Sequence, residues 1–205
     1  MLDLITIEKR YKDYIVFSNV TIHFEEGKLY ILQGVNGSGK STLLKLLVGI
    51  IYKTSGTLAK SGLISYLPDK FSFPKLMKVK NYLIEALDFK DNKKEYEKLI
   101  SKYQIPNKRI GDLSKGNWQK LGILQIMANE ATTYILDEPL DGLDENAKKL
   151  FKETVKEKLS SNKTVILALH NKTFFNDLNP IILDVKEGTI LEKKKKTRKS
   201  IDTIS

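Results

Sequence analysis

The octapeptide GVNGSGKS at residues 34–41 restricts the possible folds of this chain more than any other segment. An apolar run typical of a buried strand, KLYILQ, precedes it, and an apolar stretch with helical spacing follows it. The octapeptide fits the pattern G-x-x-x-x-G-K-[ST] at every position, a pattern in which the loop between a strand and a helix surrounds a phosphate group. A strand, a glycine-rich loop and a helix in this order predict an α/β fold.

The residue types of this loop suit phosphate chemistry. Gly37 and Gly39 allow the backbone to turn so that successive N–H groups point at phosphate oxygens, and the following helix adds the positive end of its dipole. The Lys40 ammonium would attract the β- and γ-phosphates, and the Ser41 hydroxyl would ligate Mg²⁺. The alternative is a glycine-rich turn that matches the pattern by chance. The residues expected to contact the nucleotide here are Gly34, Asn36, Gly37, Ser38, Gly39, Lys40, Ser41 and Thr42.

Two carboxylates follow a second buried strand, TTYIL, at residues 132–136. Asp137 stands at the strand end, where a nucleotide site needs an acid that binds Mg²⁺ directly or through water. Glu138 comes one residue later, and we expect it to polarise the water that attacks the γ-phosphate. The alternative is a pair of strand-end carboxylates that serves only the turn before Pro139.

Strands and helices alternate along most of the chain, which indicates a largely parallel main sheet covered on both faces. The strand-rich stretch at the start is expected to form a separate antiparallel layer, and charged helices to form a small inserted subdomain at about residues 70–130. We expect one domain over residues 1–192 and a basic, disordered tail over residues 193–205. The expected strands are 2–8, 14–24, 28–33, 62–68, 132–137, 164–169, 180–185 and 189–193. Helices are expected after the glycine loop, within 76–103, over 117–129 and 145–159, and near residue 171.

Composition excludes several classes of protein. The chain has no cysteine, which excludes a disulfide scaffold, a zinc finger and a thiol nucleophile, and which fits a reducing compartment. No run approaches the roughly 18 apolar residues that a membrane-spanning helix needs, and residues 1–13 lack the pattern of a signal peptide. We therefore expect a cytoplasmic protein.

The net charge of +10 is concentrated near the end of the sequence. Residues 193–199, KKKKTRK, carry six positive charges, and removing them leaves +4 on the rest. A body this mildly basic does not predict a nucleic-acid surface, so we expect no nucleic-acid partner. The tail is either a solvated, disordered end or a segment that contacts anionic lipid headgroups.

Several further segments, in the right order, resemble the ATP-binding cassette (ABC) ATPases, in particular the nucleotide-binding subunits of ABC transporters. LSKGNWQK at residues 113–120 is similar to the family signature, and PLDGLD at residues 139–144 is similar to its D-loop. SYLPDK at residues 65–70 corresponds to the Q-loop strand. His170 stands where the family has its switch histidine, and Tyr11 stands where family members carry an aromatic residue that stacks on adenine.

The resemblance implies a P-loop NTPase core, ATP as substrate and Mg²⁺ as cofactor. Ser114 is expected to be the N-cap of a helix that begins in the signature, and with Gly116 it would form a second anion site. One chain cannot bring both anion sites onto one phosphate, so the resemblance implies a head-to-tail dimer, either of identical or of different cassettes. It implies catalytic roles for Glu138, Lys40 and His170, although a strand-end histidine can also be a packed residue and Tyr11 can be part of the core.

The residues that the resemblance assigns to the metal are Ser41, Asp69 and Asp137. Asp69 replaces the family's Q-loop glutamine; it still offers oxygen to Mg²⁺ or water, but it is shorter and charged. In the signature, Lys115 replaces the first glycine and Asn117 replaces the glutamine, and lysine adopts positive φ less easily than glycine. The change at residue 69 bears on the coupling role that the family's glutamine has. The change at residue 115 bears on the backbone conformation of the signature.

The resemblance therefore predicts the ATP-hydrolysing subunit of a membrane transporter, by analogy an exporter. The permease would be a separate integral-membrane protein that holds the chain at the inner face of the cell membrane. We expect the coupling surface at residues 69–77, with Phe71, Phe73 and Leu76, unless one or two of these pack in the core. The alternative is a soluble ABC ATPase that acts on ribosomes, DNA or cluster assembly, although the chain has neither a second cassette nor a long coiled-coil insertion.

Overall fold

The computed structural model describes residues 1–87, 93–171 and 173–193. Its main sheet has six strands in the order β5–β6–β7–β3–β8–β9. Neighbouring strands run parallel from β5 to β8, and β9 runs antiparallel to β8. The largely parallel sheet expected from the sequence is confirmed. Its strands are β3 (Leu29–Gln33), β5 (Ile64–Leu67), β6 (Thr133–Asp137), β7 (Thr164–Ala168), β8 (Ile181–Lys186) and β9 (Thr189–Glu192).

A second, antiparallel sheet has the order β2–β1–β4, formed by β1 (Leu2–Tyr11), β2 (Tyr14–Phe24) and β4 (Ser55–Lys60). The expected antiparallel layer is therefore present, with one correction to its membership. β3, the last strand of the strand-rich start, lies inside the main sheet between β7 and β8, and β4 supplies the third strand of the layer instead. The sequence SGTLAK of β4 has few β-formers, which explains why no strand was expected there.

The strands of the main sheet alternate their side chains between two hydrophobic clusters. Tyr30 and Leu32 of β3 face α1 (Lys40–Val48) and the antiparallel sheet, whereas Leu29 and Ile31 face the remaining helices. Helix α1 lies between the two sheets because its buried leucines pack with Phe17 of β2 on one side and with the main sheet on the other. Both faces of the sheet are thus covered, as its apolar strands require.

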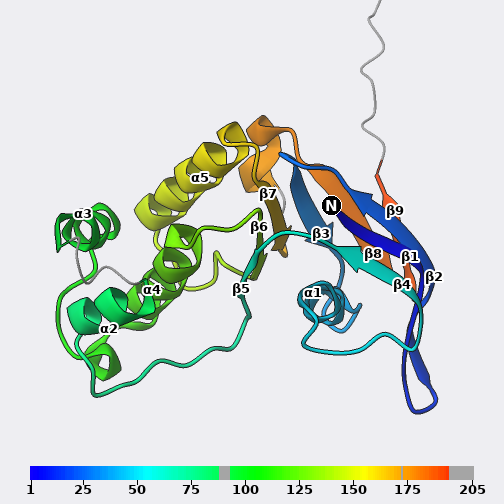
Figure 1. Ribbon diagram of the computed structural model, residues 1–205, viewed down its shortest axis with the longest axis horizontal. Helices are drawn as coiled ribbons and strands as arrows, with labels where there is room; N and C mark the ends of the chain where they lie inside the picture. Colours follow the sequence, from blue (N-terminus) through cyan, green and yellow to red (C-terminus); the bar gives the residue numbers. More distant parts are fainter. Residues whose placement is uncertain (88–92, 172, 194–205) are drawn as a thin grey trace, which may run out of the picture.

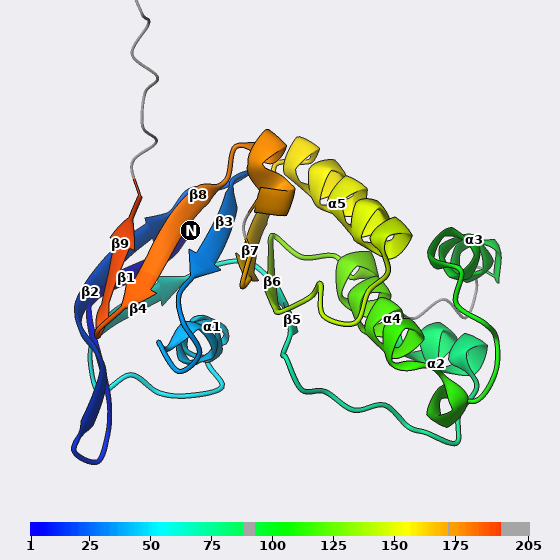
Figure 2. The ribbon, with the colours of Figure 1, turned by 180° about the vertical axis from the view of Figure 1, so that it is seen from behind.

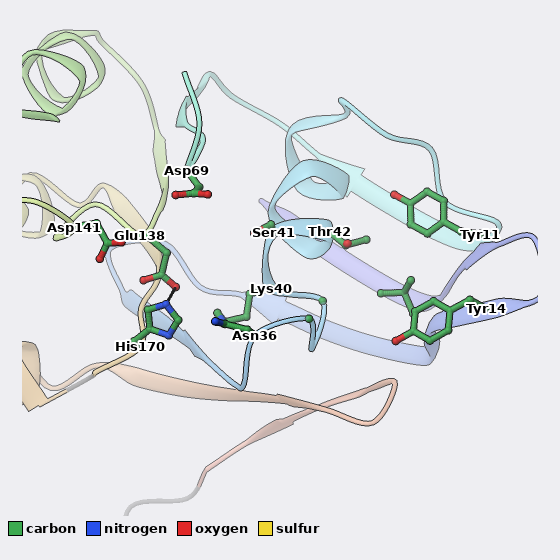
Figure 3. A pocket seen from close by; sticks show the side chains of 13 residues that line it. Tyr11, Tyr14, Asn36, Lys40, Ser41, Thr42, Asp69, Glu138, Asp141 and His170 are labelled. Carbon is green, nitrogen blue, oxygen red and sulfur yellow. Dashed lines mark ion pairs between the residues drawn. The ribbon is translucent and has the colours of Figure 1, made fainter. Parts of the chain in front are cut away.

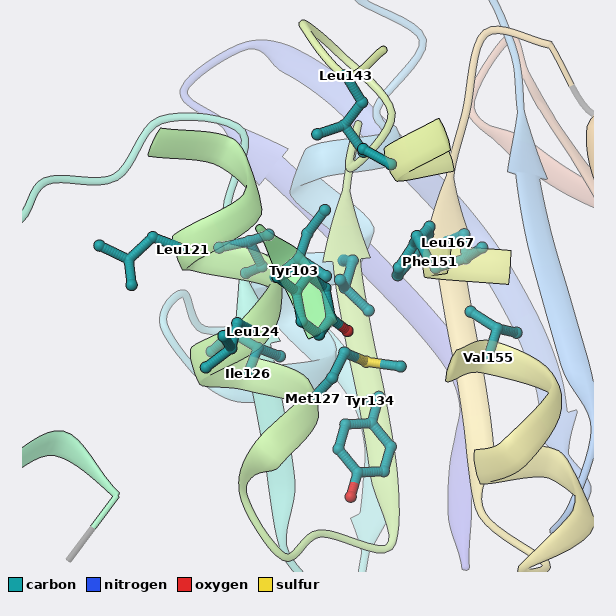
Figure 4. Close-up of a cluster of buried hydrophobic side chains, with 14 of the residues drawn as sticks. Tyr103, Leu121, Leu124, Ile126, Met127, Tyr134, Leu143, Phe151, Val155 and Leu167 are labelled. Atoms are coloured by element: carbon teal, nitrogen blue, oxygen red, sulfur yellow. The ribbon is translucent and has the colours of Figure 1, made fainter. Parts of the chain in front are cut away.

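The other helices gather on the opposite side of the main sheet and extend as an arm (Figures 1 and 2). Figure 4 shows their packing, in which Leu124 and Met127 of α4 lie near Tyr134 of β6. The helices expected near residues 70–130 and 145–159 are confirmed. They are α2 (Val79–Ala86), α3 (Lys93–Tyr103), the 3₁₀ helix η1 (Ile110–Asp112), α4 (Lys115–Ala128) and α5 (Glu145–Ser160), followed by the 3₁₀ helix η2 (Thr173–Leu178).

The proposed coupling segment, residues 69–77, divides between core and surface. Phe73 is buried against the rings of Phe71, Tyr82 and Trp118, with centroid distances of 5.4, 5.1 and 5.0 Å. Phe73 is thus a core residue of the arm and not part of an exposed surface. Leu76 is 85% exposed and remains available for contact.

Two features bear on contact with a membrane: the character of the helices and the basic tail. Among the helices of the described ranges, none has the length and apolar character needed to cross a bilayer. The basic tail expected at residues 193–205 lies outside the described residues except for Lys193, whose ammonium pairs with Asp184 at 3.0 Å.

Candidate nucleotide-binding site

A cavity of about 500 Å³ opens where the glycine loop meets the ends of β3 and β6 (Figure 3). We call it the loop cavity. Loops at the carboxyl ends of parallel strands are the usual place for ligands in α/β folds. Most residues expected to contact the nucleotide line it, although they come from distant parts of the sequence. Its lining is Tyr11, Tyr14, Val16, Asn36, Gly37, Gly39, Lys40, Ser41, Thr42, Asp69, Glu138, Asp141 and His170.

Two glycines of the loop are required by space and backbone conformation. Gly39 has φ 108° at the N-cap of α1, and a Cβ there would lie 2.8 Å from the ring of Phe17. Gly34 does not line the cavity, but a Cβ there would lie 2.5 Å from the carbonyl oxygen of Val185. Any larger residue would push the loop away from β2 or β8, so glycine is needed for the shape of the loop.

Lys40 is held inside the loop that it follows. Its side chain is buried, and Nζ donates to the carbonyl oxygens of Gly34 at 2.9 Å and Val35 at 3.4 Å. Ser38 does not line the cavity, and its buried Oγ has no hydrogen-bond partner among the described residues. A buried ammonium facing a cavity, with no described carboxylate in an ion pair with it, suits an anionic ligand.

The residues at the end of β6 fit a magnesium ion. Asp137 is buried, and its Oδ1 has no hydrogen-bond partner within the described part of the chain. Burial raises the pKa of Asp137, while a hydrogen bond with the Ser41 hydroxyl lowers it and the charge of Asp69 raises it. The described residues contain no group of three or more His, Cys, Asp or Glu that could hold a metal alone. The partnerless Oδ1 of Asp137 suits Mg²⁺, which takes one or two protein ligands and completes its shell with phosphate and water.

Glu138 is held in an unusual backbone conformation. It has φ 48°, in the left-handed region that non-glycine residues rarely occupy, and its N–H donates to the Ala168 carbonyl oxygen at 3.0 Å. Seven other non-glycine residues of the described chain share this region, so the conformation fixes where the Glu138 side chain points and does not by itself indicate a function. Nothing in the sequence indicated this conformation, because it depends on the pairing of β6 with β7.

The Glu138 carboxylate faces His170, which follows the end of β7 (Figure 3). Glu138 Oε1 lies 3.5 Å from His170 Nε2, and the imidazole is half exposed. Burial raises the pKa of Glu138, whereas His170 and Lys40 lower it. A partly buried carboxylate of raised pKa beside an imidazole can accept a proton from water, so the pair has the chemistry expected of a hydrolytic site.

The far end of the loop cavity is formed by two aromatic rings on the hairpin of β1 and β2. Tyr11 and Tyr14 are direct cross-strand partners, and Figure 3 shows their rings at the end away from Glu138 and His170. Tyr11 is 47% exposed and is therefore not a core residue. Three lining residues were not expected from the sequence, namely Tyr14, Val16 and Asp141; a two-residue turn at 12–13 would have placed Tyr14 opposite Tyr11.

The second expected anion site lies elsewhere in the molecule. Ser114 and Gly116 do not line the loop cavity; they stand at the start of α4. The predicted N-cap is confirmed, because Ser114 Oγ accepts from the N–H of Asn117 at 3.3 Å. Lys115 is an ordinary first helical residue without positive φ, so its replacement of a glycine carries no backbone strain.

The signature also touches the segment that resembles a D-loop. A Cβ on Gly116 would lie 2.9 Å from the carbonyl oxygen of Gly142, and the Lys115 side chain lies along Gly142. The start of α4 and residues 139–144 therefore form one surface next to the loop cavity, and of these residues only Asp141 lines the cavity.

Comparisons with known proteins agree with this arrangement. The family model described as ABC transporter matches residues 17–141. An uncharacterized ABC transporter ATP-binding protein of Methanocaldococcus jannaschii is 30% identical over 190 residues, covering 89% of this chain and 72% of that protein. The Nod factor export ATP-binding protein I of Burkholderia pseudomallei is 29% identical over 192 residues, covering 82% of this chain and 62% of that protein.

A solved structure is similar over nearly the whole chain. It is the dimeric, post-hydrolysis state of an ATP-binding cassette bound to ADP and Pi, with a TM-score of 0.82 at 21% identity. The match covers 95% of this chain and 98% of that one. At this identity the likeness shows a shared fold.

Proposed function

This chain belongs to the ABC transporter family of ATP-binding proteins, and from that premise we propose that it powers a membrane exporter as an ATP-sandwich dimer. It is an ATPase of the ABC class; the dimer mechanism, the direction of transport and the residue roles are the proposal. The observation that carries the proposal is the separation of two anion sites on one chain. The loop cavity contains Lys40, whereas Ser114 and Gly116 at the start of α4 do not line it.

Each anion site is incomplete alone. The Asn117 N–H is bonded to Ser114 Oγ, whereas the N–H groups of Lys115 and Gly116 have no intrahelical partner and can bind an anion. If two copies associate head to tail, the start of α4 in one copy covers the loop cavity of the other. The γ-phosphate of ATP would then lie between them, and ATP would hold the dimer together.

The roles of the cavity residues follow from their positions. Lys40 and the loop N–H groups bind the β- and γ-phosphates, and Tyr11 takes the adenine ring. Ser41 and Asp137 would hold Mg²⁺, and Asp69 would offer a carboxylate oxygen to the metal or to water. Bound Mg²⁺ supplies neutralisation of the charge that develops on the phosphates.

Hydrolysis in this proposal depends on two neighbouring side chains. Glu138 accepts the proton of the attacking water, and its strained backbone fixes where the carboxylate points. His170 Nε2, 3.5 Å from Glu138 Oε1, orients that carboxylate and contacts the γ-phosphate. Lys40 stabilises the negative charge on the departing phosphoryl group.

A separate permease would couple the free energy of ATP hydrolysis to transport. The exposed Leu76 and the segment around it support a docking surface on the helical arm. The relative named for Nod factor export supports outward transport. The chain would lie at the inner face of the membrane, where a basic tail can also contact anionic lipid.

The dimer is tested by size-exclusion chromatography with light scattering. The wild-type chain should be a monomer without nucleotide, and Glu138→Gln with saturating ATP should form a dimer because it binds ATP without hydrolysing it. The matched control is Glu138→Gln with Ser114→Arg, which keeps the loop cavity and blocks the second anion site; it should stay monomeric. A monomer of Glu138→Gln at saturating ATP would contradict the sandwich.

A further inference from the structure

The ring of Tyr11 has a cation on one face. Lys9 Nζ lies 4.3 Å from the centroid of that ring, well within the distance of a cation–π contact. Lys9 and Tyr11 are two residues apart on β1, so both side chains project from the same side of the strand. Tyr11 lines the loop cavity and Lys9 does not.

The Lys9 ammonium is also fixed in place. Nζ donates to the carbonyl oxygen of Tyr52 at 2.8 Å. The segment that contains this carbonyl is tied to β1 on the same stretch, because Thr54 N–H donates to the Glu8 carbonyl oxygen at 2.8 Å. A mobile lysine would contact the ring only part of the time, whereas this one is tethered by the backbone beside it.

No carboxylate of the described residues forms an ion pair with Lys9, although Glu8 next to it pairs with Arg10 at 3.2 Å. The ring of Tyr11 and the Tyr52 carbonyl are therefore the electron-rich groups that face this charge. A lysine of this kind is not needed to bind phosphate, because it does not line the loop cavity.

We propose that Lys9 is a positioning residue for the nucleotide base: its ammonium covers one face of the Tyr11 ring and leaves the opposite face for a purine. The contact sets the plane of the ring before ATP arrives, which reduces the ordering that binding must bring about. The cation also draws electron density from the ring, and this favours stacking with an electron-rich purine. The inference rests on the proposed role of Tyr11.

Two ligands distinguish the contribution of the base to binding from that of the phosphates. ATP uses both ends of the loop cavity, whereas inorganic tripolyphosphate uses only the end with Lys40. The quantity to measure is the ratio of the dissociation constant of tripolyphosphate to that of ATP, by calorimetry with Mg²⁺ on the full chain. A structural defect would weaken both ligands and leave the ratio unchanged.

Lys9→Met keeps the length of the side chain and removes the charge. We expect ATP to bind about three- to fivefold more weakly, as expected for loss of one partly exposed cation–π contact, and tripolyphosphate to bind as before. Lys9→Arg should restore most of the ratio, since arginine also places a cation over an aromatic ring. The matched control is Lys12→Met in the exposed turn of the same hairpin, which removes the same charge and should leave the ratio unchanged.

A double-mutant cycle completes the test. Tyr11→Ala alone should weaken ATP about tenfold, on the scale of one base–aromatic stack, and leave tripolyphosphate unchanged. Lys9→Met should then add no further loss in the Tyr11→Ala background, because the ring through which it acts is gone.

The outcomes distinguish the two proposals. If Tyr11→Ala lowers the ratio and Lys9→Met does not, the role of Lys9 is wrong and the base platform stands. If Lys9→Met weakens both ligands equally, Lys9 acts by long-range charge and the positioning role is wrong. An unchanged ratio in Tyr11→Ala would refute the base platform, and with it the role of Lys9, while the ATPase roles of Lys40 and Glu138 would be untouched.

Discussion

The two ends of the loop cavity differ in how their side chains are held. At the phosphate end, Lys40 and Asp137 are 7% and 2% exposed, and Glu138 has a strained backbone. At the base end, Tyr11 and Tyr14 are 47% and 64% exposed and stand on a hairpin. Burial and strain are costs of folding that are already met before the ligand binds, so the phosphate end is preorganised for chemistry. In the proposed function the end with the two tyrosines contributes contact area for the base, and single changes there should have smaller effects.

Replacement of Glu138, the proposed general base, should give the largest effect. Glu138→Gln keeps the shape of the side chain and removes the basic carboxylate, so we expect single-turnover hydrolysis to fall by about 10²-fold or more. ATP affinity should stay close to that of the wild type, because the carboxylate matters only when water attacks. Both quantities are measured on the same preparation, by quenched flow and calorimetry.

The pH profile offers a control for this variant. Only the ionised carboxylate can accept a proton, and burial raises the pKa of Glu138. The wild-type rate should therefore decline with falling pH from a higher pH than an ordinary glutamate would give, and Glu138→Gln should lack this decline. If the variant hydrolyses ATP at nearly the wild-type rate, the base is another group, and Asp69 in the same cavity is the first to examine.

Loss of the loop cation should come next in size. Lys40→Met removes the charge that now bonds to the Gly34 carbonyl oxygen, and we expect ATP and tripolyphosphate both to bind at least tenfold more weakly. The exposed Lys12 serves as a control of equal charge, since Lys12→Met should change neither affinity. Circular dichroism should show an intact fold. An unchanged affinity would show that the phosphates do not bind at this end of the cavity.

The smallest effect is expected at the second ring. Tyr14→Ala removes the more exposed of the two tyrosines that line the cavity. ATP should bind about twofold more weakly and tripolyphosphate equally well, less than the change expected for Tyr11→Ala. A larger loss for Tyr14→Ala than for Tyr11→Ala would make Tyr14 the base platform and would reverse the order of the two rings.

The phosphate end of the site could be predicted from the sequence because its requirements are local. A loop that surrounds phosphate needs glycines, a lysine and a hydroxyl within eight contiguous residues, and the structure places Gly37, Gly39, Lys40 and Ser41 at the cavity as expected. The N-cap Ser114 is local in the same sense, because a cap and its acceptor are three residues apart. The alternation of apolar strands and helices was likewise enough to predict the main sheet.

Other features depend on which distant segments pair, and short-range patterns do not carry that information. The third strand of the antiparallel layer is β4 because β1 needs a partner on its second edge, although its own sequence is a poor strand former. From the sequence, Phe73 looks like a surface aromatic residue in a polar segment. It is buried because the rings of Tyr82 and Trp118, on two different helices, pack against it. Burial is a property of the packed arm and not of the segment.

The glycine loop and the strand-end carboxylates could be predicted from the sequence, because those features follow from backbone sterics and hydrogen bonding among near neighbours. The folded chain was needed to show the strained φ of Glu138, the pairing of Tyr11 with Tyr14 and the place of Lys9 over the Tyr11 ring. Each of these depends on strand register or on contact with a remote backbone, and the free energy that fixes them comes from packing of the whole fold.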